Sequence, residues 1–546
     1  MPEDIQRIMG KDAQRNNILA GKMVSEVVKT TLGPRGMDKM LVTPNGDIIV
    51  TNDGVTILSE MQIEHPAAKM MVEIAKTQES EVGDGTTTSV MIAGKLLENA
   101  EKLLDQKIHP TIVAKGYRMA AEKAQEILKE ISMQITPENE EVLRQIGMTA
   151  MTGKGAEDSK EKFSEILVEA VKAVSHNNKI DLKDIKIEKI IGDDIKDTEL
   201  VSGIVLDKEK LSKDMPSLVG DAKILLIDFP LELKSPEIDT KISISSHIEL
   251  QNFLGEEERT IKAMIEKIIE TECNVLFCQK GIDDFAKYLL AKNGIYACRR
   301  VGKSDMEKLS KATGAKIISN LNEINSYDLG EANEVLEVKH SGEQMTYIRG
   351  CKNPKAVTIL IHGGTTHVVD EIERALMDGL GDIASALETR LVVPGGGAIE
   401  IELARRIRQF AQTLKGRERI SVFEFANALE FIPATLAENG GLDPIDILTE
   451  MKRRHDAGDK NAGLNLFTNR VENVLTAKII EPYKIKSQAI SSATDVAVMI
   501  LRIDDVILAK SNPKGRMNDV GTLPNYMNGL EWFNVIFQNK IFQDFS

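Results

Sequence analysis

The stretch EVGDGTTTSV, residues 81–90, sets one carboxylate, Asp84, between two glycines and follows it with three threonines and a serine. An apolar segment with helical spacing comes directly after it. The first amides of a helix have no partner within the helix and attract anions, and Mg²⁺ usually takes only one or two carboxylates from a protein that also binds phosphate. The stretch therefore predicts a magnesium–phosphate site at a helix N-terminus, with Asp84 as the metal ligand.

Three further loops have related chemistry. TTLGPRG (30–36) ends a predicted helix with glycines that allow close backbone approach, NDG (52–54) exposes Asp53, and VPGGGA (393–398) precedes another helix. Any one of them alone is more often only a tight turn. The chain contains neither G-x-x-x-x-G-K-[ST] nor G-x-G-x-x-G. A nucleotide site built from these loops would therefore be of neither the P-loop nor the Rossmann type.

Composition limits the class of protein. A chain of 546 residues is too long for one compact core, so two to four domains are expected. The net charge of -15 argues against a nucleic-acid partner, which needs a concentrated basic surface. The four cysteines form no C-x-x-C pair, the N-terminus lacks a signal-peptide pattern, and no run of 18 apolar residues occurs. These features predict a cytoplasmic protein without a membrane span.

Hydrophobic periodicity predicts how the chain is organised. Up to about residue 135 it is mainly helical, with helices over 17–31, from Pro66 and after the 81–90 stretch, and a hairpin around Asn45-Gly46. From ILLIDF onward short apolar runs alternate with helices, which is typical of an α/β domain. Helices return beyond Gly364. Helical ends around an α/β middle predict a discontinuous helical domain.

Six motifs carry a family resemblance: TTLGPRGMDKMLV, TNDGVTIL, VGDGTTTSV, VPGGGAIEIELA, TLAENGGLDPIDIL and ATDVAVMILRIDDVI. In this order and spacing the chain resembles a group II chaperonin subunit over about residues 1–511, most like an archaeal thermosome subunit and similar to the subunits of the eukaryotic cytosolic TCP-1 ring complex. The resemblance implies a multidomain α and α/β chaperonin fold. The helical equatorial domain would be split between 1–138 and 397–511, the small α/β intermediate domain between 139–208 and 360–396, and the α/β apical domain would span 209–359.

The resemblance also implies site residues. Asp378 would orient or activate the attacking water, Asp53 would flank the γ-phosphate of ATP, and Asp84 would bind Mg²⁺. Lys154 would sense the γ-phosphate, and Glu481 would bind the ribose. The full set of implied nucleotide contacts is Leu32, Gly33, Pro34, Gly85, Thr86, Thr87, Thr88, Lys154, Gly396, Asn461, Ala462, Gly463 and Glu481. Without the resemblance, Asp378 would be read as a solvated helix residue and Lys154 as a surface lysine.

The part of the apical domain that would bind substrate proteins is expected near residues 241–269, where the family carries a helical protrusion that serves as a built-in lid. Its apolar residues would either bind non-native chains or pack within the protrusion: Ile244, Leu250, Phe253 and Leu254. No separate co-chaperonin lid would then be needed. The sequence departs from the family at Met377, where a histidine is usual, at GLNLFT, and in the aromatic tail 512–546, which holds the only tryptophan, Trp532.

The expected function is that of an ATP-dependent chaperone that encapsulates and folds non-native proteins. Identical or paralogous subunits would form stacked double rings, with ATP, ADP and Mg²⁺ as ligands. Two alternatives stay open: a nucleotide-binding structural subunit of a mixed ring with little turnover, and a small-molecule phosphotransferase. The joint presence of Asp53, Asp84 and Asp378 argues against the first, and the lack of an acceptor motif argues against the second.

Overall fold

The computed structural model of the chain describes residues 5–43, 46, 48–176, 179–232, 247–340, 342–352 and 354–509. It divides into two compact units, of which the larger spans Gly10–Asp504 and the smaller holds the two chain ends. In the smaller unit, β1 (Ile5–Met9) pairs antiparallel with β21 (Asp505–Ala509). Because these strands come from opposite ends of the chain, no local sequence pattern indicates their pairing.

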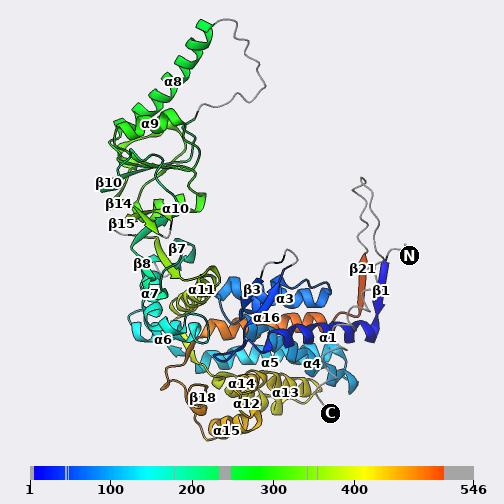
Figure 1. Ribbon diagram of the computed structural model, residues 1–546. Helices are drawn as coiled ribbons and strands as arrows, with labels where there is room; N and C mark the ends of the chain where they lie inside the picture. Colours follow the sequence, from blue (N-terminus) through cyan, green and yellow to red (C-terminus); the bar gives the residue numbers. More distant parts are fainter. Residues whose placement is uncertain are drawn as a thin grey trace. The chain divides into compact units, whose positions relative to one another are not determined.

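In the larger unit, one helical core draws on both halves of the chain (Figure 1). Its helices are α1 (Gly10–Lys29), α3 (Pro66–Val82), α4 (Thr86–Asp105), α5 (Pro110–Ile131), α12 (Ala398–Thr413), α13 (Glu418–Leu429) and α16 (Tyr483–Leu501). Small residues on α16, such as Ala493 and Ala497, are fully buried and let neighbouring helices approach closely. The predicted discontinuous helical core is confirmed in this respect. The helix expected over 17–31 begins earlier, at Gly10, because Ala13 already lies on its buried face.

A second core lies between helices and a three-stranded sheet. The helices are α6 (Glu140–Met151), α7 (Lys160–Val174) and α11 (Thr366–Thr389), and the sheet has the order β7 (Ile185–Ile191), β16 (Val357–Gly363), β8 (Glu199–Val201). The central strand β16 is parallel to β7 and antiparallel to β8, and all its residues are buried. That burial explains its largely apolar sequence, VTILIHG.

A third region is built on a seven-stranded sheet. The strands run β12 (Tyr296–Cys298), β11 (Val275–Cys278), β10 (Leu218–Ile227), β14 (Gly330–His340), β15 (Glu343–Arg349) and β9 (Gly203–Leu206), and β13 (Ile317–Ile318) also pairs with β10. The helices are α8 (His247–Glu270), α9 (Asp284–Lys292) and α10 (Lys303–Thr313). Along β10, Ile224 and Leu226 enter one core while Leu225 and Ile227 enter another. The predicted α/β middle is confirmed, since alternate residues of this strand are buried on both faces.

Two short helices add residues to the helical core, α2 (Gly54–Glu60) and α14 (Phe431–Asn439). The other α-helix and strands are α15 (Pro444–Asp456), β2 (Lys39–Val42), β3 (Ile48–Thr51), β4 (Met133–Gln134), β5 (Ser175–His176), β6 (Lys179–Ile180), β17 (Leu391–Pro394), β18 (Ala462–Asn465), β19 (Arg470–Asn473) and β20 (Ile480–Pro482). The hairpin predicted around Asn45-Gly46 is confirmed by the antiparallel pairing of β2 with β3, although Asn45 lies outside the described residues. The stretch Glu418–Asn439 is long and apolar enough to cross a membrane, but 67% of its apolar 18-residue window is buried inside the protein. It is the core segment formed by α13 and α14.

Two predicted regions fall partly outside the described residues. In the protrusion expected at 241–269, helix α8 accounts for the part from His247 onward, while Ile244 and the side chains of Leu250, Phe253 and Leu254 are outside the description. The tail 512–546, with Trp532, also lies outside it. All four cysteines are free and buried, as expected for small apolar side chains rather than disulfide partners.

Candidate functional site

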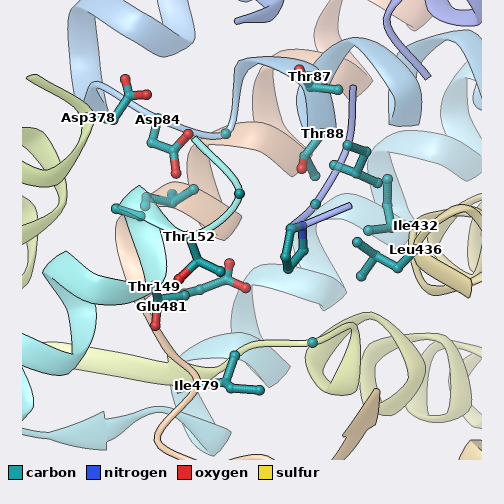
Figure 2. Close-up of a pocket in the computed structure, with 18 of the residues that line it drawn as sticks. Asp84, Thr87, Thr88, Thr149, Thr152, Asp378, Ile432, Leu436, Ile479 and Glu481 are labelled. Carbon is teal, nitrogen blue, oxygen red and sulfur yellow. The ribbon is translucent and has the colours of Figure 1, made fainter. Parts of the chain in front are cut away.

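A pocket of about 230 Å³ lies where the glycine-rich loops converge. Figure 2 shows Asp84 and Asp378 close to each other in this pocket, with Thr87 and Thr88 on another side. Ile432 and Leu436 supply an apolar wall, and Thr149, Thr152 and Glu481 lie together at a third side (Figure 2). An apolar wall beside carboxylates and free helix amides suits a ligand with a flat apolar part and a charged part.

The loop before α4 has a conformation that glycine alone adopts easily. Gly83 and Gly85 have φ angles of 92° and 80°, in the left-handed region. Gly85 is the N-cap of α4 and offers no side chain to the first amides of the helix, which therefore stay available for an anion. The buried side chain of Gln78 holds the loop by donating to the carbonyl of Asp84 at 2.9 Å.

The loop after α1 packs against the segment that follows α6. A Cβ atom on Gly153 would lie 2.6 Å from the Cα of Pro34, so only glycine fits there. Asn52 Nδ2 donates to the carbonyl of Gly153 at 3.2 Å. These contacts place Lys154, the next residue, in the lining of the pocket beside the glycine-rich loops.

A partly buried ion pair of the site joins Lys154 to Asp378 on α11. The Lys154 ammonium donates a hydrogen bond to Oδ2 of Asp378. Burial raises the pKa of Asp378 to about 7, with the carboxylates of Asp84 and Asp53 adding to the rise and Lys154 opposing it. The carboxylates around Lys154 outweigh its burial and raise the pKa of its ammonium. Near neutral pH, Asp378 can therefore both accept and release a proton.

Asp53 also lines the pocket, and its carboxylate is hydrogen-bonded to residues of its own loop. It is the N-cap of α2 and accepts hydrogen bonds from the backbone of Val55 at 3.3 Å and of Thr56 at 2.8 Å. The hydroxyl of Thr56 adds a third bond at 2.6 Å. This cap holds the NDG loop against the pocket, whatever further role the carboxylate has.

A second buried charge cluster surrounds Glu481 on β20. Lys486 donates to Oε2 of Glu481 at 2.6 Å and to Oε1 of Glu400 at 2.9 Å. Burial raises the pKa of Glu481 despite Lys486, since Glu400 competes for the same ammonium. A Cβ on Gly395 would lie 2.6 Å from Oε1 of Glu481, so the glycine leaves room for this carboxylate.

Asp382, four residues after Asp378 on α11, is a pocket residue that the sequence analysis did not single out. It is only 3% exposed, and its Oδ1 is buried without a hydrogen-bond partner. Burial and the nearby Asp84 carboxylate raise the pKa of Asp382 well above its usual range. The spacing of four from Asp378 was the available indication, because such residues share a helix face.

The donor set fits a magnesium–nucleotide complex. Asp84 stands beside helix amides that favour phosphate, and Lys154 adds a cation. Within the described residues no group of three or more His, Cys, Asp or Glu side chains could hold a metal by itself. Such sparse protein ligation suits Mg²⁺, which takes its other ligands from phosphate and water.

Most of the predicted site residues line this one pocket. Those that do are Leu32, Gly33, Pro34, Asp53, Asp84, Gly85, Thr86, Thr87, Thr88, Lys154, Asp378, Gly396 and Glu481. Asn461, Ala462 and Gly463 are not among the lining residues; Gly463 instead packs against the backbone of Gly395 and Gly396. The pocket is lined there by the next residues, Leu464 to Phe467. The sequence analysis missed these, together with Thr149, Thr152, Asp382 and Lys486.

A helical core shared by distant segments, an inserted seven-stranded sheet region and this pocket define a nucleotide-binding chaperonin subunit. The chain belongs to the TCP-1/cpn60 chaperonin family, whose model matches residues 24–511, and within it to the group II chaperonins.

Relatives and a solved structure agree with this assignment. A thermosome subunit of Methanopyrus kandleri is 55% identical over 518 residues, covering 94% of this chain and 95% of the relative. The thermosome subunit beta of Archaeoglobus fulgidus is 55% identical over 516 residues, with the same coverage. The open-state monomer of a group II chaperonin from Methanococcoides burtonii is 47% identical, with a TM-score of 0.58, and the match covers 77% of this chain and all of that one.

Proposed function

We propose that this chain is a subunit of an ATP-driven chaperonin, which encloses non-native polypeptides in a cytoplasmic double ring of identical or paralogous subunits. The observation that supports it best is the partly buried pair of Lys154 and Asp378, which lines the same pocket as Asp84 and the N-terminus of α4. A carboxylate whose pKa lies near neutrality, a cation and free helix amides are the groups that phosphoryl transfer to water requires.

Each residue has a stated part in this proposal. The amides at the start of α4 and the loop from Leu32 to Pro34 would bind the phosphates, and Glu481 the ribose. Asp84 would hold Mg²⁺, which when bound neutralises phosphate charge and orients the phosphate oxygens. Lys154 would place its charge on the γ-phosphate. Asp378 would take the proton of the attacking water, and its pKa of about 7 suits that task.

The cores also support the expected division into domains. The helical core corresponds to the proposed equatorial domain at 1–138 and 397–511. The core around α11 and β16 falls mostly within the proposed intermediate domain at 139–208 and 360–396, and the seven-stranded sheet mostly within the proposed apical domain at 209–359. Two strands cross these bounds: β9 belongs to the seven-stranded sheet, and β16 belongs entirely to the three-stranded sheet of the second core. The site draws residues from the first two of these regions, so that bound nucleotide would link them.

Assembly into rings is supported by an exposed apolar face. In the β2–β3 hairpin, Met40 is paired with Val50 and Val42 with Ile48, and all four side chains are exposed, by 38% to 68%. A two-stranded sheet with one uncovered apolar face is marginal in water by itself. We infer that a neighbouring subunit covers this face in the assembled ring.

Steady-state ATP hydrolysis by the purified assembly, beside Asp378→Ala, tests the proposal. We expect slow hydrolysis by the parent and a loss of about 10² or more in kcat for the variant, which still binds nucleotide. Equal rates would show that Asp378 is not the base. A parent that binds ATP without turnover would favour the alternative of a structural subunit in a mixed ring, although the joint presence of Asp53, Asp84 and Asp378 argues against it.

A further inference from the structure

Asp382 carries an unusual combination of burial and lack of a partner. Its side chain lies among the residues that line the nucleotide pocket, yet it is 3% exposed and its Oδ1 makes no hydrogen bond. A buried polar atom without a partner destabilises the folded protein. Such atoms are rare and call for an explanation, which at a binding site is often a partner that arrives with the ligand.

The surrounding protein groups do not supply that partner. The nearest ammonium, that of Lys154, donates to Asp378 instead. Asp84 is a carboxylate and therefore repels any charge on Asp382. Among the described residues no salt bridge includes Asp382, so a charge there would be stabilised only at longer range by Lys154, which is already paired with Asp378. The side chain is thus suited to hydrogen bonding rather than to carrying a charge.

Helix geometry directs Asp382 to the same place as Asp378. Residues four apart lie on one face of a helix, with Cβ atoms about 5–6 Å apart. Both side chains line the nucleotide pocket from α11. Ser385 offers a contrast on the same helix: it is also buried with an unpaired Oγ, but it lines a neighbouring pocket and not this one.

We propose that Asp382 is a positioning residue of the nucleotide site, whose carboxyl group hydrogen-bonds a water held beside the phosphates and keeps it within reach of Asp378. This inference rests on the proposed ATP hydrolysis and adds to it a second polar group on α11. The proposed role depends on the ability of the Asp382 side chain to form hydrogen bonds and not on its charge. An amide of the same shape can therefore replace the carboxyl group, while an aliphatic side chain cannot.

The test compares Asp382→Val, Asp382→Asn and Ser385→Ala in the assembled protein. We expect Asp382→Val to lower kcat for ATP about tenfold or more, with KM within about twofold, because orientation of the water matters in the transition state. Asp382→Asn should keep kcat within about threefold of the parent. Ser385→Ala should leave both constants unchanged.

Thermal unfolding without nucleotide gives an independent measurement. Valine removes an unpaired buried polar group, so Asp382→Val should unfold at a higher Tm than the parent while it hydrolyses ATP more slowly. Ser385→Ala should also raise Tm, but with no change in hydrolysis. A purely structural role for Asp382 predicts the opposite combination, a lower Tm together with weaker nucleotide binding.

Several outcomes would overturn the inference. Parental kcat in Asp382→Val would show that the carboxyl group has no part in hydrolysis. A slow Asp382→Val with a lowered Tm would assign it a structural role, and an Asp382→Asn as slow as Asp382→Val would refute the hydrogen-bonding role. If the parent itself hydrolyses no ATP, the proposed function fails as well. If the parent hydrolyses ATP and Asp382→Val has the same kcat, the positioning role is rejected while the proposed function stands.

Discussion

The ammonium of Lys154 is hydrogen-bonded to the carboxylate of Asp378, although 224 positions separate the two residues. Lys154 follows α6, and Asp378 lies on α11. Both helices contribute to the same hydrophobic core, which brings the two side chains to one edge of the pocket. The pair therefore places a potential phosphate-binding cation next to a potential base.

Loss of the Lys154 ammonium should slow hydrolysis. We expect Lys154→Met to lower kcat by about 10² or more, since the methionine keeps the apolar stem but removes the charge from the phosphate site. Steady-state ATP turnover measures the effect. Lys123→Met is the matched control, because Lys123 lies on α5, is not a pocket residue, and among the described residues its ammonium contacts only Glu126 and the ring of Phe410. Equal losses in both variants would contradict a specific role for Lys154.

The pH dependence of kcat/KM should report the ionisation of Asp378. This ratio reflects ionisations of the free enzyme, and a base acts only when it is deprotonated. With a pKa of about 7, kcat/KM should rise as the pH increases from 6 to 8 and reach half its upper value near pH 7. The measurement is a pH series at constant ionic strength. A flat profile over this range would argue against Asp378 as the base.

Acid should remove the stabilising contribution of Glu402. Its side chain is fully buried and accepts from His455 at 3.0 Å and from Arg405 at 2.7 Å. His455 also faces the carbonyl of Ala462 at 2.9 Å, so both ring nitrogens meet acceptors. These partners hold the pKa of Glu402 far below its ordinary value. The contribution is thus complete above the unfolded pKa and disappears as the pH falls toward the folded one.

We therefore expect Glu402→Gln to destabilise the protein by about 2 kcal/mol at pH 7, because it removes the carboxylate that accepts hydrogen bonds from the partly exposed guanidinium groups of Arg405 and Arg406. The difference from the parent should shrink as the pH drops below about 4.5. Urea unfolding at several pH values measures it. Glu450→Gln, which alters only surface pairs with Arg453 and Arg454 on α15, should show little change. A difference that does not depend on pH would contradict the assignment.

The exposed face of the β2–β3 hairpin should be required for assembly. Replacing Met40 by lysine places a charge in the middle of this apolar face and should shift the protein from large assemblies toward monomers. Light scattering coupled to size-exclusion chromatography measures the mass. Tyr288→Lys, at an exposed position of α9, is the control and should leave the mass unchanged. Intact assemblies of Met40→Lys would show that this face is not a subunit contact.

Local sequence patterns predicted much of this architecture. The glycines around Asp84 predicted a loop before a helix, and the structure confirms left-handed glycines directly before α4. The apolar run in ILLIDF predicted a strand, found as β10. Such features depend on neighbours within a few residues, where backbone preference and hydrophobic spacing decide the outcome. The roles assigned to the site residues stay predictions.

Other parts depend on contacts between distant segments. The glycine-rich loops, with Asp84 and three threonines before a predicted helix, indicated a phosphate site without the family resemblance. The resemblance then indicated which carboxylates belong to that site. Only the tertiary structure decided that Lys154 donates to Asp378, that Lys486 is shared by Glu400 and Glu481, and that Asp382 is buried without a partner. The physical reason is that burial and pairing set the charge and hydrogen bonding of a side chain, and both arise from packing of helices that are far apart in sequence.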